Sequence, residues 1–327
     1  MSKNFNLNKA RQAKFDEFYT QLSEIEKELR HYKSHFKNKV VLCNCDDPWV
    51  SNFFHYFSFS FKELGLKKLI TTCYKNQQRD MFSQNDSQRA IYLEYTGIKS
   101  GKNVPSVEEI GVKQLEGDGD FRSAECIELL KQADIVVTNP PFSLFREYVA
   151  QLIEYNKKFL IIGNVNAITC KEIFKLLKAN ELWLGTGFQN GNAFFKIPAN
   201  NAHNFANGVY DEKTGLVKFR NICWYTNLDH SKRHENITLF RYYTSNEYPH
   251  YDNYDAINVD KVADIPIDWS GVMGVPVTFL DKYNPEQFEI VGESSYHDGQ
   301  EYTKPINFIN GKMIYHRILI RNKKGRR

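Results

Sequence analysis

The regular alternation of short apolar runs with helically spaced segments constrains the fold of this chain more than any other feature. Residues 40–42 begin a run that is apolar throughout, which is typical of a strand buried on both faces of a sheet. Phe53, Phe57 and Phe61 follow at steps of four, which places them on one face of a helix. Strands are predicted at residues 40–45, 68–74, 134–138, 159–163, 181–184 and 221–226, and helices at 22–36, 51–64, 144–155 and 171–178. This order predicts an α/β fold built on a doubly wound, parallel sheet.

The chain changes character after residue 185. At roughly 100–200 residues per domain, 327 residues correspond to two domains. Residues 185–207 are rich in Gly and Asn, and from Asp229 onward the sequence is rich in Tyr, Asn, Asp and Pro without a clear period. We therefore predict one domain over residues 1–228 and a smaller, irregular region over residues 229–327.

The composition narrows the class of protein. Hydrophobic residues make up 42% and charged residues 25%, which excludes a disordered, collagenous or coiled-coil chain. The sequence has no apolar run of about 18 residues and no apolar segment near its N-terminus, so we expect a cytoplasmic protein without a membrane span or signal peptide. Its six cysteines form no CxxC pair, so neither disulfides nor a metal site are expected.

The charge permits a polyanionic partner without requiring one. The net charge is +4, from 43 basic and 39 acidic residues. Five of the last seven residues are basic: Arg321, Lys323, Lys324, Arg326 and Arg327. Such a tail can contact phosphates or can simply keep the terminus soluble.

The strongest chemical signal is Asn139-Pro140-Pro141-Phe142, directly after a predicted strand. Two consecutive prolines fix the backbone and remove two N–H donors, which gives a rigid loop with free carbonyl acceptors. The Asn139 side-chain oxygen and the Pro140 carbonyl can accept the two hydrogens of a planar amine while Phe142 stacks on its ring. The loop is therefore a candidate catalytic site, and a stiff strand-to-helix turn is the structural alternative.

Polar residues after the other strands suggest a cofactor site, because ligands of open parallel sheets bind outside the carboxyl ends of the strands. The sequence lacks G-x-G-x-x-G and G-x-x-x-x-G-K-[ST], which disfavours phosphorylated cofactors. It has instead short polar side chains at Asn44, Asp46, Asp47, Asp118 and Asp120. These suit the hydroxyls, amines and sulfonium of S-adenosylmethionine, although Gly-Asp-Gly-Asp at 117–120 can also be an acidic surface turn.

Six strings then carry a family resemblance that runs almost from end to end. They are DEFYTQ at 16–21, CNCDDP at 43–48, GDGDFRS at 117–123, TNPPFSLF at 138–145, YDNYDAINV at 251–259 and GVMGVP at 271–276. With them the chain resembles the EcoRI-type adenine-specific DNA methyltransferases of restriction–modification systems. The resemblance implies a Rossmann-like methyltransferase domain over 1–228 and a target-recognition region over 229–327, with base contacts from the latter and from the loops of 185–207.

The resemblance also implies the reaction and its residues. It implies methyl transfer from S-adenosylmethionine to the N6 amine of an adenine in duplex DNA, within GAATTC or a similar site. By motif, Phe18, Tyr19 and Thr20 correspond to a methionine-binding segment, Asn44 and Asp46 to the segment after the first strand, and Asp120 and Phe121 to the cofactor adenine site. The glycine-rich pattern expected after the first strand is absent, so the choice between Asp46 and Asp47, and between Asp118 and Asp120, stays open. No acidic residue ends the second strand, so a ribose ligand is not identifiable.

The expected mechanism requires the adenine to rotate out of the duplex, because a stacked base cannot reach the loop. Stacking on Phe142, and on Trp224 or Tyr225, is expected to recapture it. Alignment matters more than a strong base for this transfer, so no catalytic histidine is predicted. Cys223 can lie near the base pocket or simply pack in a strand. The expected partner is duplex DNA, bound by a monomer that pairs functionally with a restriction endonuclease.

Three alternatives use the same features differently. A glutamine N5 protein methyltransferase would grip a carboxamide with the same loop. A DNA-binding regulator would retain the fold without activity, and a nuclease would need a cluster of metal-binding acids that the sequence does not present convincingly. A cytosine C5 methyltransferase is excluded, because the chain has no Pro-Cys nucleophile.

Overall fold

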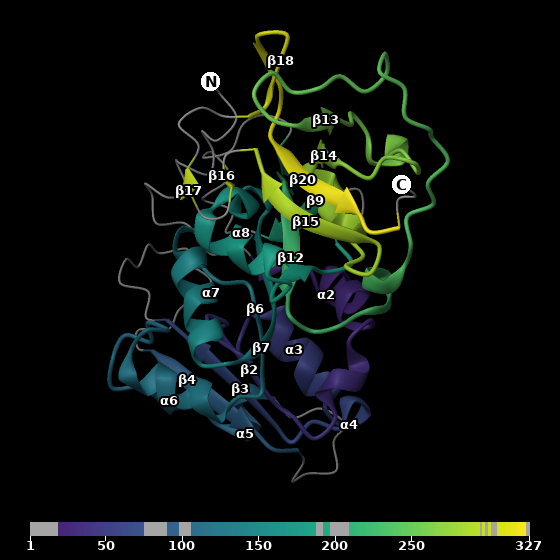
Figure 1. The fold of residues 1–327 in the computed structure, drawn as a ribbon. Coiled ribbons are helices and arrows are strands. Elements are labelled where there is room, and N and C mark those ends of the chain that lie inside the picture. The colour runs from purple at the N-terminus through teal and green to yellow at the C-terminus, as the bar shows by residue number, and fades with distance from the viewer. Residues whose placement is uncertain are drawn as a thin grey trace. The chain divides into compact units, whose positions relative to one another are not determined.

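A computed structural model describes residues 19–74, 90–97, 106–187, 192–196, 209–294, 296–297, 300–301 and 306–324 (Figure 1). The chain divides into two compact units. The first comprises Met1–Val165 and Gly187–Leu228, and the second comprises Asn166–Thr186 and Asp229–Arg327. Residues 166–186, which the sequence assigned to the first domain, are thus grouped with the C-terminal part. No described helix is both long and apolar enough to cross a bilayer.

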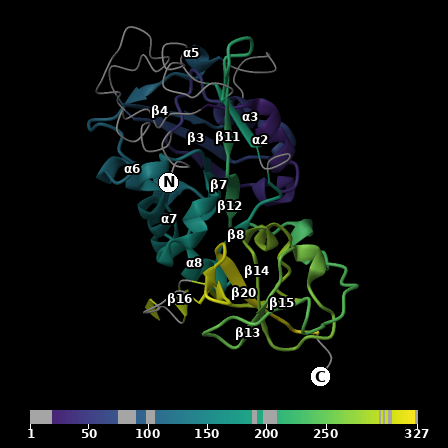
Figure 2. The same ribbon diagram turned by 90° about the horizontal axis from the view of Figure 1, so that it is seen from above.

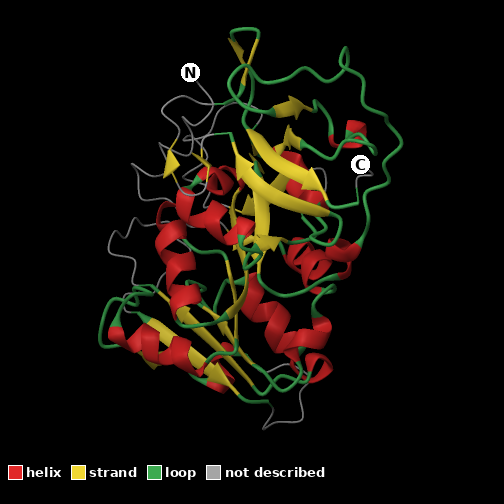
Figure 3. Ribbon diagram, viewed as in Figure 1, coloured by secondary structure: helices red, strands yellow, loops and turns green. Residues whose placement is uncertain are grey.

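A mixed sheet forms the core of the first unit (Figure 3). Within this unit its strands run in the order β5-β4-β3-β2-β6-β7-β12. The inner strands are parallel: β2 (Val40–Cys43), β3 (Lys68–Cys73), β6 (Ile135–Thr138) and β7 (Lys158–Asn164). The outer ones are antiparallel to their neighbours: β4 (Ile91–Tyr95), β5 (Lys113–Gln114) and β12 (Ile222–Thr226). The predicted all-parallel sheet is therefore wrong at its edges, because an apolar run does not encode strand direction.

Helices cover both faces of this sheet. The helices are α2 (Leu22–Leu29), η1 (Lys33–Phe36), α3 (Asn52–Phe59), α4 (Phe61–Leu64), α5 (Val107–Ile110), α6 (Ala124–Gln132), η2 (Phe142–Leu144) and α7 (Phe145–Glu154). Figures 1 and 2 place α2 and α3 on one face and α6 and α7 on the other. The Ser51 side chain caps α3 by accepting from the Phe53 and Phe54 amides, and the rings of Phe53 and Phe57 are buried.

A smaller antiparallel sheet completes the first unit. Its order is β1 (Tyr19–Thr20), β9 (Asn192–Lys196), β11 (Leu216–Arg220) and β10 (Tyr210–Asp211). Most of the Gly- and Asn-rich stretch lies outside the described residues, but β9 crosses it and buries Ala193 and Phe195.

The second unit contains a sheet of its own, so this region is more regular than predicted. Its elements are η3 (Val165–Thr169, shared with the first unit), α8 (Lys171–Lys178), β8 (Trp183–Leu184), η6 (Ser231–His234), β13 (Ala256–Asn258), η7 (Val262–Asp264), β14 (Val272–Pro276), η8 (Val277–Lys282), β15 (Phe288–Glu293), β16 (Tyr296–His297), β17 (Gln300–Glu301), β18 (Phe308–Ile309), β19 (Lys312–Met313) and β20 (Arg317–Asn322). The main sheet has the order β13-β14-β20-β15-β16-β17. Met273, Ile318 and Ile320 from its strands are fully buried.

Arg233 joins the two segments of the second unit. Arg233 is 9% exposed, and its guanidinium stacks on Trp183, with 3.7 Å between Cζ and the ring centroid. It also donates to the Asn180 side-chain oxygen and lies 3.7 Å from Asp229. A buried guanidinium is costly unless it is paired, so these contacts tie residues 166–186 to the C-terminal part.

Candidate active site

Threonines hold the segment that follows β2. The Thr72 hydroxyl donates to the Asn44 side-chain oxygen at 2.7 Å, and the Thr71 hydroxyl donates to the Asp46 carbonyl at 2.6 Å. The Asp46 amide donates to the Thr72 carbonyl at 2.7 Å. Cys45, between them, has a φ of +70°, a backbone conformation rare for a side chain other than glycine or asparagine. The turn after β2 is therefore fixed against the end of β3.

Thr138 connects this turn to the Asn139 loop. It is the last residue of β6 and is fully buried. Its hydroxyl lies 2.5 Å from Asp46 Oδ2 and also contacts the Asn44 carbonyl oxygen. The segments after β2 and β6, each predicted to carry site residues, are thus in direct contact.

Asp46 is a buried carboxyl, of which 8% is exposed. Burial raises the pKa of Asp46 to about 7, while hydrogen bonds from Thr138 and Ser51 lower it and the neighbouring Asp47 raises it. The Ser51 hydroxyl donates to Oδ1 at 2.8 Å. Asp47 plays a different part, because its Oδ1 accepts from the Trp49 amide at 3.0 Å. Of the two acids, Asp46 is the one that faces Thr138.

The Gly-Asp-Gly-Asp loop packs directly on the end of β3. Gly119 has a φ of +79°, and a Cβ there would lie 2.6 Å from the Cys73 carbonyl oxygen. The Asp118 side chain accepts from the Asp120 amide at 3.0 Å. Burial and the carboxylates of Asp118 and Asp120 raise the pKa of Tyr74, which follows β3. Both acids therefore lie near the carboxyl end of β3.

Asp120 is engaged by a neighbouring arginine. Its carboxylate accepts from Arg122 Nε at 2.9 Å and Nη2 at 2.7 Å, and this pairing lowers the pKa of Asp120. Arg122 also pairs with Glu147 at 2.8 Å. A ligand amine that binds Asp120 would therefore share the carboxylate with Arg122.

Tyr148 links the cofactor candidates and was not predicted as a site residue. It lies on α7, fully buried, and its ring packs edge-on against Phe121 with 4.9 Å between centroids. Burial raises the pKa of Tyr148 well above its usual value, and nearby Cys45 and Asp46 raise it further. Its helical spacing from Phe145 indicated only a core residue, whereas Thr138 could have been found from its place directly before Asn139.

The Asn139 loop is stiff and partly accessible. Asn139 and Pro141 are half-buried, Pro140 is buried, and 8% of Phe142 is exposed. The Pro141 carbonyl accepts from the Leu144 amide at 3.0 Å and so begins η2. The Phe142 ring belongs to the apolar core of the first unit, at the base of the loop.

Trp224 and Tyr225, which were expected to help Phe142 to stack on the base, are core residues in this structure. All five residues of β12 are buried. Trp224 packs edge-on against Phe53, and the Tyr225 hydroxyl donates to the Asn164 carbonyl at 2.8 Å. Cys223, on the same strand, is likewise buried.

The N-terminal segment contributes one describable side chain. Phe18 and the side chain of Tyr19 lie outside the described residues. Thr20 is buried, its carbonyl accepts from Asn52 Nδ2 at 2.8 Å, and its hydroxyl has no hydrogen-bond partner in the described part of the chain. Buried hydroxyls are normally paired, so this one fits a polar ligand.

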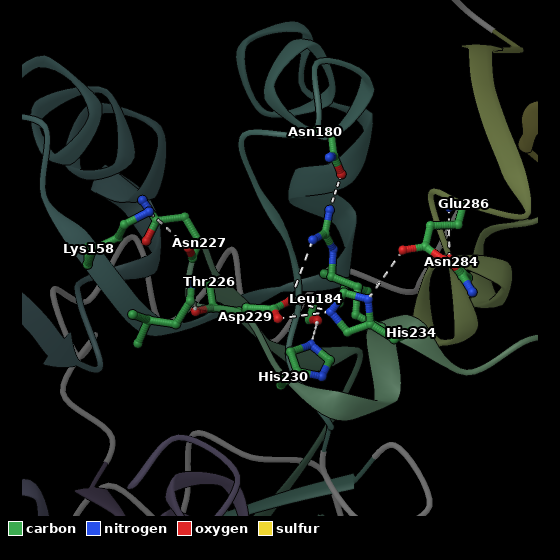
Figure 4. Close-up of polar contacts among 12 residues, drawn as sticks. Lys158, Asn180, Leu184, Thr226, Asn227, Asp229, His230, His234, Asn284 and Glu286 are labelled. Atoms are coloured by element: carbon green, nitrogen blue, oxygen red, sulfur yellow. Dashed lines mark hydrogen bonds and ion pairs between the residues drawn. The ribbon is translucent and has the colours of Figure 1, made fainter. Parts of the chain in front are cut away.

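Histidines of the second unit make structural contacts. His230 is buried and lies 3.0 Å from the Leu184 carbonyl, to which its Nε2 donates. His234 contacts both carboxylate oxygens of Asp229, at 2.8 and 2.9 Å (Figure 4). Burial lowers the pKa of His230, which favours the neutral ring.

The basic C-terminal residues are partly committed to internal contacts. Arg321 pairs with Glu289 at 3.2 Å, and Lys323 donates to the Pro285 carbonyl at 2.7 Å. Arg326 and Arg327 lie outside the described residues. All six cysteines are free thiols.

Comparisons with known proteins agree across nearly the whole chain. The family model "Adenine-specific methyltransferase EcoRI" matches residues 6–323. Type II methyltransferase M.EcoRI of Escherichia coli is 51% identical over 97% of this chain and 96% of its own length. M.MgeORF184P of Mycoplasma genitalium and M.MpnI of Mycoplasma pneumoniae, also type II methyltransferases, are each 41% identical, over 88% and 87% of this chain and 85% and 84% of their own lengths. No solved structure matches the chain significantly.

Proposed function

The chain belongs to the EcoRI family of adenine-specific methyltransferases and is a DNA methyltransferase, and from this premise we propose that it methylates the N6 amine of an adenine rotated out of duplex DNA. The observation that carries the proposal is the contact of Thr138 with Asn44 and Asp46. It brings the Asn139 loop against the turn that follows β2. A base held by the Asn139 loop would therefore lie beside a cofactor held by that turn.

Each residue of the Asn139 loop has a part in this proposal. The Asn139 side-chain oxygen and the Pro140 carbonyl accept the two amine hydrogens, which orients the nitrogen lone pair away from the loop. Rotating a base out of the stack costs a few kcal/mol, and stacking on one aromatic ring returns about 1–3 kcal/mol. Phe142 is the ring that lies at this loop.

S-adenosylmethionine, when bound, supplies the methyl group. The residues that suit it are Thr20, whose hydroxyl has no hydrogen-bond partner among the described residues, Asn44 and Asp46 in the turn after β2, and Asp118, Asp120 and Phe121 beside β3. Phe18 and Tyr19 complete the proposed set by motif. The four parallel strands with helices on both faces support a Rossmann-like arrangement for this part of the chain.

The proposed target is GAATTC or a closely related site, and the second unit is proposed to read it. The enzyme is proposed to act as a monomer and to belong to a restriction–modification system with a partner endonuclease. The 51% identity to M.EcoRI supports it. The test is transfer of labelled methyl groups to a duplex with one GAATTC, with mapping of the modified base by mass spectrometry. We expect N6-methyladenine in that duplex and none in a scrambled one. Label in a cytosine, or in protein glutamine, contradicts the proposal.

A further inference from the structure

The small antiparallel sheet of the first unit has one buried face and one accessible face. The side chains that β9 and β11 bury in the core of the unit are Ala193, Phe195, Val217 and Phe219. Successive side chains of a strand point to opposite faces, so the residues between them lie on the other face. There Phe194 is 39% exposed, Arg220 is exposed, and Leu216 and Lys218 are half-buried. We call these four side chains the outer face.

The outer face carries two cations beside one aromatic ring. Lys218 is the cross-strand partner of Phe194, and its ammonium nitrogen lies 6.0 Å from the centroid of that ring. Arg220 follows on the same side of β11, about 7 Å further along the strand. Within the described part of the chain, neither side chain forms an ion pair or a hydrogen bond. Both charges are therefore available to an anionic ligand.

The acidic residues of this sheet lie toward its opposite end. Asp211 ends β10 and Glu212 begins the turn that leads to β11. Asp211 pairs with Leu216, the first residue of β11, and its carboxylate accepts from the Lys213 amide at 2.9 Å. The positive end of the outer face is therefore the end at which β11 finishes.

That end of β11 lies at the same edge of the main sheet as the Asn139 loop. Arg220 is followed by Asn221, whose φ of +63° turns the chain into β12 (Figure 2). The Asn221 carbonyl accepts from the amide of Val165, the residue directly after β7, at 2.7 Å. Strand β7 is the parallel neighbour of β6, and Asn139 directly follows β6. The outer face therefore leads to the edge at which the adenine is proposed to bind.

We propose that the outer face binds the DNA backbone beside the adenine held at the Asn139 loop, with Lys218 and Arg220 on neighbouring phosphates and the Phe194 ring against the sugar between them. This rests on the proposed function, because the base must lie at that loop for the backbone to pass this face. Two cations about 7 Å apart on one strand suit successive phosphates of one DNA strand. Phosphate contacts position a duplex without reading its sequence. The face therefore holds the backbone, and the sequence is read elsewhere.

The salt dependence of DNA binding tests this surface, because each neutralised phosphate contributes about −0.9 to the slope of log K against log salt. Fluorescence anisotropy measures this slope from 50 to 200 mM NaCl, on the duplex that the wild type methylates. In the double variant Lys218→Ala/Arg220→Ala we expect the slope to decrease in magnitude by about 2 and binding at 50 mM to weaken at least about tenfold. Its preference for that duplex over a scrambled one should stay within about twofold of wild type.

Three further variants serve as controls. Lys213→Ala removes an exposed lysine in the β10–β11 turn, away from the proposed contact, and should leave the slope unchanged. Lys218→Arg/Arg220→Lys retains both charges and should retain the slope. Phe194→Ala removes no charge, so it should weaken binding about threefold at an unchanged slope. All variants should match the wild type in thermal unfolding and in S-adenosylmethionine affinity.

Neutral phosphates locate the contact on the DNA. Methylphosphonates on both sides of the target adenine should weaken binding by the wild type at least about fivefold more than binding by the double variant, which has already lost the cations. The same substitution one helical turn away should weaken both proteins equally. Equal weakening by the substitution beside the adenine contradicts the placement.

Three other results overturn the inference: an unchanged slope in the double variant, an equal change in Lys213→Ala, or a loss of preference for the methylated duplex. In each case a wild type that still forms N6-methyladenine leaves the proposed function standing. A wild type that forms none contradicts the proposed function itself.

Discussion

Asp46 illustrates how far a single residue can be understood from its neighbours in the sequence. Its place after a buried strand predicted that it would lie at the carboxyl edge of the sheet, and it does. Its distinction from Asp47 could not be predicted, because it depends on Thr138 and Ser51. The contact between Asp46 and Thr138 joins residues that are 92 positions apart, so the local sequence does not reveal it.

The stability of the protein should depend on pH through Asp46. Burial raises the pKa of Asp46 to about 7 in the folded chain, against about 4 when unfolded, so the folded state binds this proton more tightly. The group's contribution is greatest below pH 4 and is lost as the pH rises to 7. We expect Asp46→Asn to be more stable than wild type by roughly 3–5 kcal/mol above pH 7, with the difference vanishing near pH 4, in urea unfolding followed by circular dichroism. A difference that does not change with pH contradicts the assignment.

Asn139→Ala should reduce methyl transfer at least about 100-fold, because it removes an acceptor that orients the amine. Binding to the duplex should change by less than fivefold, since the other contacts to DNA remain. Single-turnover assays and fluorescence anisotropy measure the two effects. Ser143→Ala is the control, since this exposed residue lies just beyond the loop. Equal losses in both variants would place the effect in the fold of the loop and not in Asn139.

At the scale of elements, apolar runs predicted the inner strands within one or two residues, because their burial on both faces leaves a strong local signal. The sheet of the second unit escaped prediction. Its strands are two to six residues long, and β14 pairs with β20 some forty residues further on, so no local period reveals them. The burial of Trp224 and Tyr225 could have been predicted locally, because a strand that is apolar throughout is typically buried on both faces.

Gly119→Ala should move the Gly-Asp-Gly-Asp loop away from β3. The added Cβ would meet the Cys73 carbonyl at 2.6 Å, at a φ that alanine adopts with strain. We expect a loss of about 2 kcal/mol or more in urea unfolding and at least a tenfold loss of S-adenosylmethionine affinity by calorimetry. Gly111→Ala is matched in φ, at +84°, but its added Cβ meets no atom within 4 Å. It should cost about 1 kcal/mol and leave cofactor affinity unchanged. Equal loss of affinity in both variants would disprove a role for the close approach.

At the scale of the whole molecule, the second unit is built from two separated segments of the chain. A fragment limited to residues 229–327 lacks Trp183 and Asn180, so it leaves the buried Arg233 without its stacking and hydrogen-bond partners. Losing the partners of a buried charge costs about 3–5 kcal/mol. We expect no cooperative thermal transition from this fragment by circular dichroism, and recovery of one when residues 166–186 are fused to it through a flexible linker. Cooperative unfolding of the short fragment would contradict this account.

The position of β20 also governs when the protein can finish folding. This strand lies between β14 and β15 and pairs with both, although it comes last of the three in the chain. On the ribosome, therefore, nearly every residue must be translated before the second sheet can close. Helix α8, in which Ile173, Phe174 and Leu177 are buried, contacts β15, and β15 in turn pairs with β20. During this time the incomplete sheet is exposed to chaperones and proteases. A truncated transcript that lacks the codons for β20 should therefore yield a chain that is degraded.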